Sequence, residues 1–397
     1  MIPFARPHIG AEEEEAVLRV LRSGWLTTAA EALAFETEFA RFLEGAGAAA
    51  LAVNSATSGL HLALEACGVG PGDLVALPSY TFAATAGAVR YLGAEPVFVD
   101  IAPGTFHLDP SALERTLKRL AGNRRAYRFA RGDWGPAGAA KAVIPVHFGG
   151  LPCDMDAITA IAKEYSLKII EDAAHAFPSR LASGAWAGAI GDAGVFSFYA
   201  TKTITTGEGG MVVTKNPETA SRMRIMRSHG IDRSIWNRYT DTKAPWYYQV
   251  AAPGYKYNMP DLLAAIGRVQ LGKARGLLAM RKEIAAGYDA AFAGDGRFIL
   301  PPTGEGDARH LYPLRFRGAG GFRDQCIEKL RDVGVGVSVH FIPLHTMPYY
   351  KKQYGFEDGD FPESLAAFKG EVSLPIWPGM EAAHVQRVID AVLLSPP

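Results

Sequence analysis

The first two thirds of the chain alternate between two hydrophobic patterns. Short runs of apolar, often β-branched residues are separated by segments in which apolar residues recur every three or four positions, and this alternation predicts strands between helices. Because the runs are almost continuously apolar, as in strands covered on both faces, we expect an α/β fold with a mostly parallel sheet. The expected strands are 73–78, 95–101, 142–148, 167–172, 192–198 and 210–214, and the expected helices include 12–23, 58–68, 154–166 and 217–228.

The pattern changes after residue 228. Residues 229–260 are rich in Tyr and Trp and show little periodicity. A long irregular segment with this aromatic content is more typical of a functional element than of a disordered one. A helical stretch follows at about 261–293. The last hundred residues mix expected strands (310–316 and 336–341) with expected helices (322–334 and 380–394).

The length of 397 residues suits two domains, and we expect a large α/β domain over 1–250 and a smaller α+β domain over 251–397. Lys and Arg together number 41, as do Asp and Glu, so the formal charge is zero. This balance argues against a protein built to bind nucleic acid or an anionic membrane surface. We interpret a basic, Gly-rich stretch at 122–141 as a solvated loop rather than a binding loop.

The three cysteines (Cys67, Cys153 and Cys326) are far apart and form no CxxC pair, so we expect neither a disulfide framework nor a cysteine zinc site. The first residues lack the apolar core of a secretory signal. No apolar run approaches the length of about 18 residues that a spanning helix needs. We therefore expect a protein of the reducing cytoplasm.

Polar residues gather at three places in this pattern. Asp172 ends the strand at 167–172, after Glu171 and three residues before His175, and the polar cluster 54–58 leads into a helix. Lys202 follows the strand at 192–198 among aromatic and apolar neighbours. Ligands of open α/β sheets bind at the carboxyl ends of the strands, where these residues would meet. Simpler interpretations exist, since Asp172 and the hydroxyls suit helix caps and a lone lysine usually lies on the surface.

Together these residues offer the groups that pyridoxal 5'-phosphate (PLP) needs. An enclosed lysine with a lowered pKa forms the Schiff base, a carboxylate such as Asp172 keeps the pyridine nitrogen protonated, and a hydroxyl-rich helix start binds the phosphate. Tyr80 or Phe82, after another strand, offers a ring to stack on the cofactor. His340 and His345 have no clear third ligand, so we expect no metal site.

Two motifs, EDAAHA (171–176) and SFYATKTITTGEGGMVVT (197–214), resemble those of the DegT/DnrJ/EryC1/StrS sugar aminotransferases. The resemblance runs from SGWLTT (23–28) to SLPIWPGM (373–380) and implies a fold-type I aminotransferase with a mostly parallel seven-stranded sheet and PLP as cofactor. It implies that Lys202 is the Schiff-base lysine and proton carrier and that Asp172 pairs with the pyridinium. The other implied cofactor contacts are His175 near the phenolic oxygen, Phe82 on the ring, and Ala56, Thr57 and Ser197 on the phosphate, with Ser55 and Ser58 as weaker candidates.

The aromatic segment departs from the family pattern, because GYKYN (254–258) stands where many members have GYNYR. Thr203 also follows the lysine where many members have Asn. In the family this loop reaches the neighbouring subunit's active site. The resemblance therefore implies a homodimer in which either Lys256 or Asn258 meets a cofactor phosphate across the interface. The candidate substrate contacts are Lys256, Tyr257, Arg233 and Glu208, the last in the turn beside the lysine.

A GYKYN loop after HGID (229–232) looks most like the enzymes that make UDP-4-amino-4-deoxy-L-arabinose. The resemblance thus implies amino transfer from L-glutamate, which leaves as 2-oxoglutarate, to carbon 4 of a UDP- or dTDP-linked keto sugar, for glycan, lipopolysaccharide or natural-product biosynthesis. Amination at carbon 3, amination of a cyclitol ketone, and a PLP-binding regulatory protein are the alternatives. Members that dehydrate keto sugars carry His in place of the Schiff-base lysine, so Lys202 favours transamination.

Overall fold

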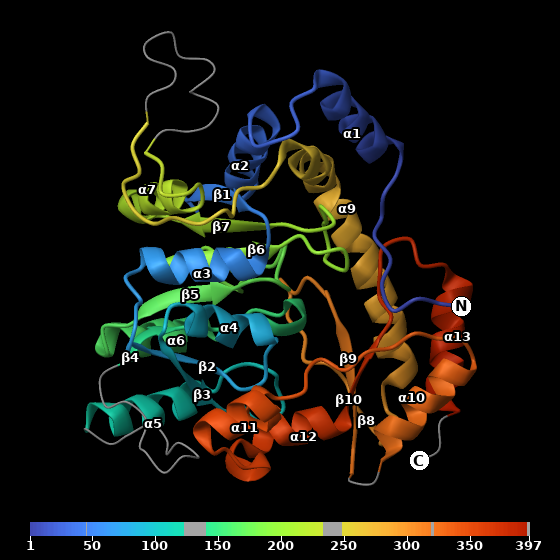
Figure 1. Cartoon of the computed structure of the whole chain (residues 1–397). Coiled ribbons are helices and arrows are strands. Elements are labelled where there is room, and N and C mark those ends of the chain that lie inside the picture. Colours follow the sequence, from blue (N-terminus) through green and yellow to red (C-terminus); the bar gives the residue numbers. More distant parts are fainter. Residues whose placement is uncertain (45, 123–139, 233–247, 319–320, 395–397) are drawn as a thin grey trace.

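The computed structural model describes residues 1–44, 46–122, 140–232, 248–318 and 321–394. Its centre is a seven-stranded sheet, as expected, in which five neighbouring strands are parallel and β7 runs antiparallel to both of its neighbours (Figure 1). In order across the sheet, the strands are β1 (Ala49–Val53), β7 (Gly210–Thr214), β6 (Ala193–Ser197), β5 (Lys168–Asp172), β4 (Ala140–Val143), β2 (Leu74–Pro78) and β3 (Glu95–Val99).

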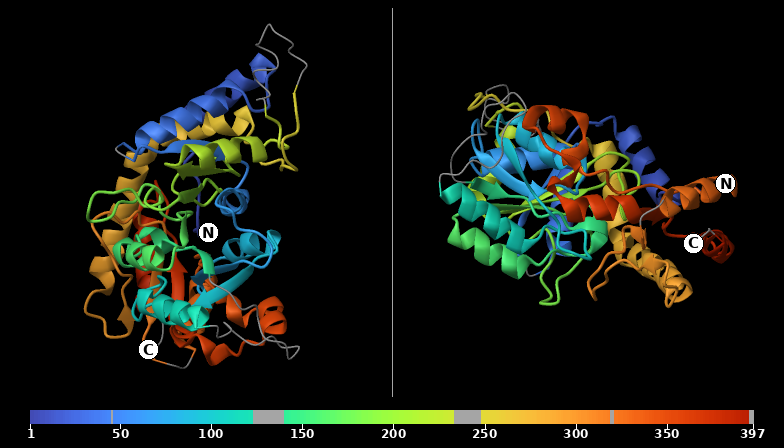
Figure 2. Two further views of the ribbon diagram at one scale, coloured as in Figure 1. Left: turned by 90° about the vertical axis from the view of Figure 1, so that its left-hand side faces the viewer. Right: turned by 90° about the horizontal axis from the view of Figure 1, so that it is seen from below.

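Helices cover both faces of this sheet. Alternate residues of a strand point to opposite sides, so the apolar strands offer both faces for packing. In β1, Leu51 and Val53 pack into one apolar core, and Ala50 and Ala52 pack into another. Figure 2 shows the helices around the sheet from two further directions. The first core includes α3 (Ala56–Ala66), α4 (Ala83–Tyr91) and α7 (Pro217–Met226), and the opposite face is covered by α2 (Ala30–Phe42), α5 (Pro110–Ala121), α6 (Met155–Glu164) and the start of α9 (Asp261–Phe292).

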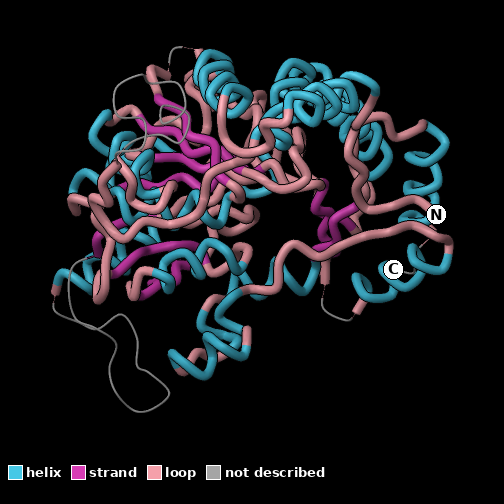
Figure 3. The backbone as a smooth tube through the Cα atoms, turned by 45° about the horizontal axis from the view of Figure 1, so that its top comes forward, coloured by secondary structure: helices cyan, strands magenta, loops and turns pink. Residues whose placement is uncertain are grey.

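The second group of strands forms a small antiparallel sheet that is separate from the first (Figure 3). The long helix α9 connects the two regions, since it packs against α1 (Ala11–Ser23) and α2 and also against α13 (Ala382–Leu393). The domain boundary that we expect at residue 250 stays a prediction. The small sheet has the order β10 (Glu371–Leu374), β9 (Tyr312–Phe316) and β8 (Phe298–Ile299), and α10 (Phe322–Asp332) and α12 (Pro362–Gly370) pack against it. The short helix α11 (Pro348–Tyr354) instead packs against β3 of the large sheet.

Two of the expected strands differ from the structure. The strand expected at 336–341 is wrong, because this segment makes only an isolated bridge between Ser338 and Ser373. The backbone N–H of His340 donates to the Glu371 carboxylate at 2.9 Å, so it is not available for a ladder with β10. The strand expected at 142–148 is shorter, since β4 ends at Val143. Most of the basic stretch 122–141 lies outside the described residues. None of the described helices is both long enough and apolar enough to cross a bilayer.

Candidate active site

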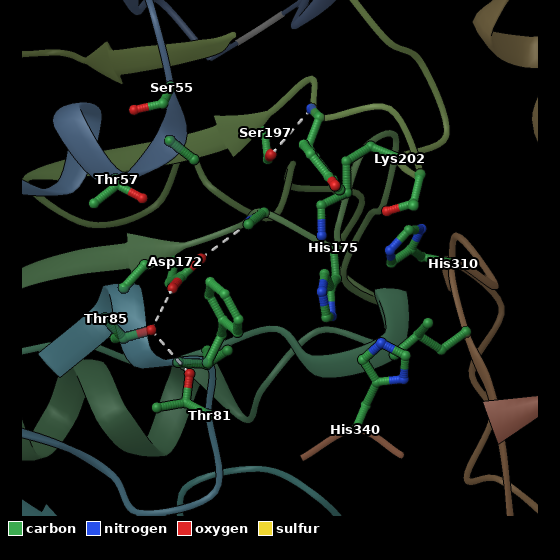
Figure 4. A pocket seen from close by; sticks show the side chains of 18 of the residues that line it. Ser55, Thr57, Thr81, Thr85, Asp172, His175, Ser197, Lys202, His310 and His340 are labelled. Carbon is green, nitrogen blue, oxygen red and sulfur yellow. Dashed lines mark hydrogen bonds between the residues drawn. The ribbon is translucent and has the colours of Figure 1, made fainter. Parts of the chain in front are cut away.

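A cavity of about 520 Å³ lies at the carboxyl ends of the central strands. Asp172 ends β5, Ser197 ends β6, and Lys202 lies in the loop that joins β6 to β7. Residues from far along the chain close the other side, among them His310 and His340 (Figure 4). The sequence prediction that the polar residues meet at this edge of the sheet is therefore confirmed.

The start of α3 forms the hydroxyl-rich wall of the cavity. Ser55 is the N-cap of this helix, and its Oγ accepts a hydrogen bond from the Ser58 N–H at 3.1 Å. Ser55, Ala56 and Thr57 line the cavity. Ser58 does not, because its buried hydroxyl donates to Asn54 Oδ1 at 2.6 Å and so completes the helix cap. Free backbone N–H groups and hydroxyls at a helix start are suited to bind a phosphate.

The glycines after the lysine allow a close approach to this wall. A Cβ atom on Gly210 would lie 2.8 Å from the backbone nitrogen of Ala56, which real side chains do not tolerate. Gly207 has a φ of 80°, in the left-handed region that favours glycine. The permissive backbone of TTGEGG therefore lets the lysine loop and β7 press against the helix start.

Asp172 is a buried carboxylate held by two donors. The Thr85 hydroxyl donates to its Oδ2 at 2.9 Å, and the Ala174 N–H donates to its Oδ1 at 3.2 Å. Burial raises the pKa of Asp172, whereas these hydrogen bonds and the charge of Lys202 act in the opposite direction. A buried carboxylate with a free flank is suited to pair with a cation in the cavity.

The neighbouring acid, Glu171, serves a structural purpose. Its carboxylate accepts hydrogen bonds from the backbone N–H groups of Gly188, Ile190 and Gly191 at 2.7–2.8 Å. It also contacts His147 Nε2 at 2.9 Å in the interior. Adjacent strand residues point to opposite faces, so only Asp172 of this pair lines the cavity.

Lys202 lines the cavity together with Asp172. Burial lowers the pKa of its amine to about 8, although the nearby Asp172 raises it. About a tenth of the amine is therefore neutral at pH 7, far more than for an ordinary lysine, and this neutral form is the one that a nucleophile or proton carrier requires. His175 also lines the cavity, and its Nδ1 accepts a hydrogen bond from the Gly149 N–H at 3.3 Å. Burial and the charge of Lys202 hold the pKa of His175 well below its usual range, so its ring is neutral.

The remaining predicted residues fall into three groups. Phe82 and Glu208 line the cavity, and the Phe82 ring is 61% exposed and therefore open to a stacking partner. Arg233 lies outside the described residues. The loop residues Lys256, Tyr257 and Asn258 do not line the cavity of their own chain.

The GYKYN loop instead lies against β1 and α3. The Tyr257 hydroxyl contacts His61 Nδ1 at 2.9 Å, and Asn258 is buried, with its Nδ2 donating to Thr28 Oγ1 at 2.5 Å. The side chain of Lys256 is exposed and makes no ion pair within the part of the chain that the structure describes. Of the three loop residues, only Lys256 presents a free charge outward.

The sequence did not single out several residues of this cavity. His310 is the first residue of the strand expected at 310–316, a position that was the only available signal, and Thr85 lies inside α4. For His340 and His345 the sequence favours packing or a substrate contact over a metal site. The described residues contain no group of three or more metal-ligating side chains. His345 is buried, and its ring nitrogens contact the Ser79 hydroxyl and the Asp358 carbonyl.

The donor set fits PLP, since one cavity holds an amine of lowered pKa, a buried carboxylate and a hydroxyl-rich helix start. The sequence model of the DegT/DnrJ/EryC1/StrS aminotransferase family matches residues 7–393. The chain belongs to this family. It is thus a PLP-dependent aminotransferase.

Relatives of known name agree with this family assignment. The spore coat polysaccharide biosynthesis protein SpsC of Bacillus subtilis (strain 168) is 42% identical over 98% of this chain and 96% of its own length. Spr1654 of Streptococcus pneumoniae, solved in PLP and pyridoxamine phosphate (PMP) forms, matches in its PMP form with a TM-score of 0.87 and 31% identity over 99% of this chain and 98% of its own. Helicobacter pylori PseC, an aminotransferase of pseudoaminic acid biosynthesis, matches with a TM-score of 0.86 and 27% identity over 99% and 98% of the two chains. The family member described here is therefore a sugar aminotransferase.

Proposed function

We propose that this enzyme transfers the amino group of L-glutamate to carbon 4 of a UDP- or dTDP-linked keto sugar. Membership of the sugar aminotransferase family supports the reaction class, and the observation that carries the proposal is the Lys202 amine beside Asp172 in one cavity. The similarity to SpsC, a spore coat polysaccharide biosynthesis protein, supports a sugar destined for a glycan. The GYKYN loop at 254–258 supports carbon 4 and a nucleotide-linked substrate.

The cavity residues divide the binding of the cofactor among them. Ser55, Ala56, Thr57 and Ser197 lie at the ends of β1 and β6, where the helix start of α3 binds the phosphate. Phe82 stacks on the ring. The neutral His175 ring accepts from the Gly149 N–H through Nδ1, so its Nε2 carries the proton and donates a hydrogen bond to the phenolic oxygen, and Glu208 at the exposed rim contacts substrate.

Lys202 and Asp172 carry the proton chemistry. Bound PLP supplies an electron sink for the carbanion that forms when the donor loses its Cα proton. The neutral Lys202 Nζ removes that proton and later returns one to the sugar carbon. The Asp172 carboxylate keeps a proton on the ring nitrogen, and the surrounding burial strengthens this charge pairing.

We further propose that the enzyme works as a homodimer in which Lys256 reaches a phosphate in the neighbouring subunit's site. Lys256 is exposed and makes no ion pair within the described ranges, which supports it as the phosphate contact. Asn258 is buried, and its side chain donates a hydrogen bond to Thr28. The separate cysteines support a reducing cytoplasmic setting.

The absorption spectrum of the purified protein tests the proposal. A cofactor band in the near-visible region that L-glutamate removes, and that one keto sugar from a panel of UDP- and dTDP-linked 4-keto sugars restores, is the expected result. The panel also includes a 3-keto sugar and a cyclitol ketone. If only the 3-keto sugar restored the cofactor band, the enzyme would aminate carbon 3. If only the cyclitol ketone restored it, the acceptor would be a cyclitol. A protein without this band after incubation with PLP would contradict the role of Lys202.

A further inference from the structure

The cavity has a second polar wall opposite the hydroxyl-rich helix start. Figure 4 shows Ser55 and Thr57 at one end of the site and His310 and His340 at the other, with His175 between them. The phosphate and ring contacts of the proposed function use the first end. The histidine end is therefore left for the parts of the substrates that do not react.

His310 presents an unused N–H to this end. It is 4% exposed, and its Nδ1 has no hydrogen-bond partner among the described residues. Burial and the charges of neighbouring groups hold its pKa well below the usual range, so the neutral ring carries one proton. A buried N–H without an acceptor is rarer in proteins than a bare acceptor. We therefore assign the proton to Nε2, which leaves the buried Nδ1 as the bare acceptor.

A buried arginine lies directly behind His310. Arg281 on α9 is 2% exposed, and its Nη1 donates to the backbone carbonyls of His310 at 3.1 Å and Ile376 at 2.8 Å, two residues that line the cavity. Burial lowers its pKa only to about 10, so the guanidinium stays charged at neutral pH. Its Nε has no hydrogen-bond partner, and no carboxylate forms an ion pair with it, within the described ranges.

A buried cation without a counter-charge is costly, and this cost falls when an anion binds nearby. The field of Arg281 reaches the cavity, since it lowers the pKa values of Lys202 and His310. Only two acids among the described residues line the cavity, and neither neutralises this end. Asp172 faces the far end beside Thr85, and Glu208 is exposed at the rim.

We propose that His310 Nε2–H, backed by the buried charge of Arg281, binds a carboxylate of the amino donor. This inference rests on the proposed function, in which the donor is a dicarboxylic amino acid. His310 is the contact residue, and Arg281 is a positioning residue that fixes the His310 backbone and supplies the charge. A sugar hydroxyl is a weaker partner for this wall, because it leaves the buried cation uncompensated.

The test uses glutarate, a dicarboxylate that has no amino group and so cannot react. Its affinity for the cofactor-loaded dimer is measured by calorimetry in the wild type and in three variants. His310→Phe keeps a ring against His175, 4.6 Å away between ring centroids, and removes both nitrogens. His310→Leu removes them with a different shape. His310→Gln keeps an N–H donor near the position of Nε2.

We expect both apolar variants to bind glutarate roughly tenfold to hundredfold more weakly, as for the loss of a hydrogen bond to a charged group. His310→Gln recovers most of the affinity. If an apolar variant that still loads the cofactor binds glutarate within about twofold of the wild-type affinity, the role of His310 is overturned and the proposed function is unaffected. A wild-type enzyme that glutamate does not bleach and that does not bind glutarate would overturn both the donor assignment and this inference.

Discussion

The Thr85 hydroxyl donates a hydrogen bond to Asp172 Oδ2 at 2.9 Å, and Thr81 contacts Thr85 at the same distance. The hydrogen bond from Thr85, in the first turn of α4, counteracts the effect of burial on the Asp172 pKa. We expect Thr85→Val, which removes the donor and keeps the shape, to raise that pKa further. A hydrogen bond to a charged group contributes about 1.5–3 kcal/mol. The glutamate half-reaction, followed by stopped-flow absorbance, should slow by roughly 10- to 150-fold.

Thr85→Ser is the matched control for this prediction, because it retains the hydroxyl and should react at nearly the wild-type rate. Equal rates in the Val and Ser variants would show that the Asp172 carboxylate does not depend on Thr85.

The lowered pKa of Lys202 predicts a specific pH dependence. An ordinary lysine is protonated below a pKa of about 10.4, whereas burial lowers the pKa of Lys202 to about 8. Only the neutral amine attacks the aldehyde of PLP. The rate of cofactor uptake by the cofactor-free enzyme should therefore rise with pH through about 8 and then level off.

The Asp172→Asn variant tests which groups set the pKa of Lys202. The negative charge of Asp172 raises the Lys202 pKa, so its removal should move the midpoint below 8. A wild-type rate that still climbs steeply above pH 9, near the ordinary range of lysine, would contradict the enclosed environment.

The sequence predicted the sheet end of the active site well and the other end poorly. Asp172, Ser197 and Lys202 follow directly from apolar strands, and parallel strands bring their carboxyl ends together. His310 and Phe4 line the same cavity, but they come from segments whose placement depends on tertiary packing. No local pattern encodes that proximity.

Strand prediction failed for a related reason. The segment 336–341 has the composition of a strand, yet His340 N–H bonds to the Glu371 side chain instead of to a backbone carbonyl. Conversely, β1 has the sequence AALAV at 49–53, in which alanine gives little strand signal. Its pairing with β7 and its burial on both faces determine its conformation.

A buried ion pair connects two helices, α7 and α2, with strand β1 of the large sheet. Arg227, at the end of α7, pairs with Glu36 of α2, and both side chains are buried. Arg227 Nη1 also donates to the Ala52 carbonyl of β1 at 2.9 Å, and Glu36 accepts from the Ala52 N–H at 3.0 Å. We expect Arg227→Met to reduce the free energy of unfolding by about 3–5 kcal/mol, because it leaves a buried carboxylate unpaired.

Urea unfolding followed by circular dichroism measures this loss. Combining Arg227→Met with Glu36→Gln removes the unpaired charge and should recover part of the stability. If the single variant lost less than about 1 kcal/mol, the pair would behave like an exposed ion pair despite its burial.

The proposed contact across the dimer interface can be tested by mixing inactive subunits. Lys256→Ala alone should lose most activity if its amine holds a phosphate in the partner's site, and Lys202→Ala alone should be inactive. In a dimer of one subunit of each kind, one site combines the intact Lys202 of one chain with the intact Lys256 of the other. Random reassociation makes half of the dimers mixed, so about a quarter of the wild-type activity should return.

A second mixture is the control, because Lys202→Ala and Asp172→Asn affect residues that serve the same chain's site. No mixed dimer of this pair contains an intact site, and no activity should return. If the Lys256→Ala mixture also failed to recover, while a mixture with Asn258→Ala did, the buried Asn258 would be the interface residue. That result would require the hydrogen bond from Asn258 to Thr28 to break on dimerisation.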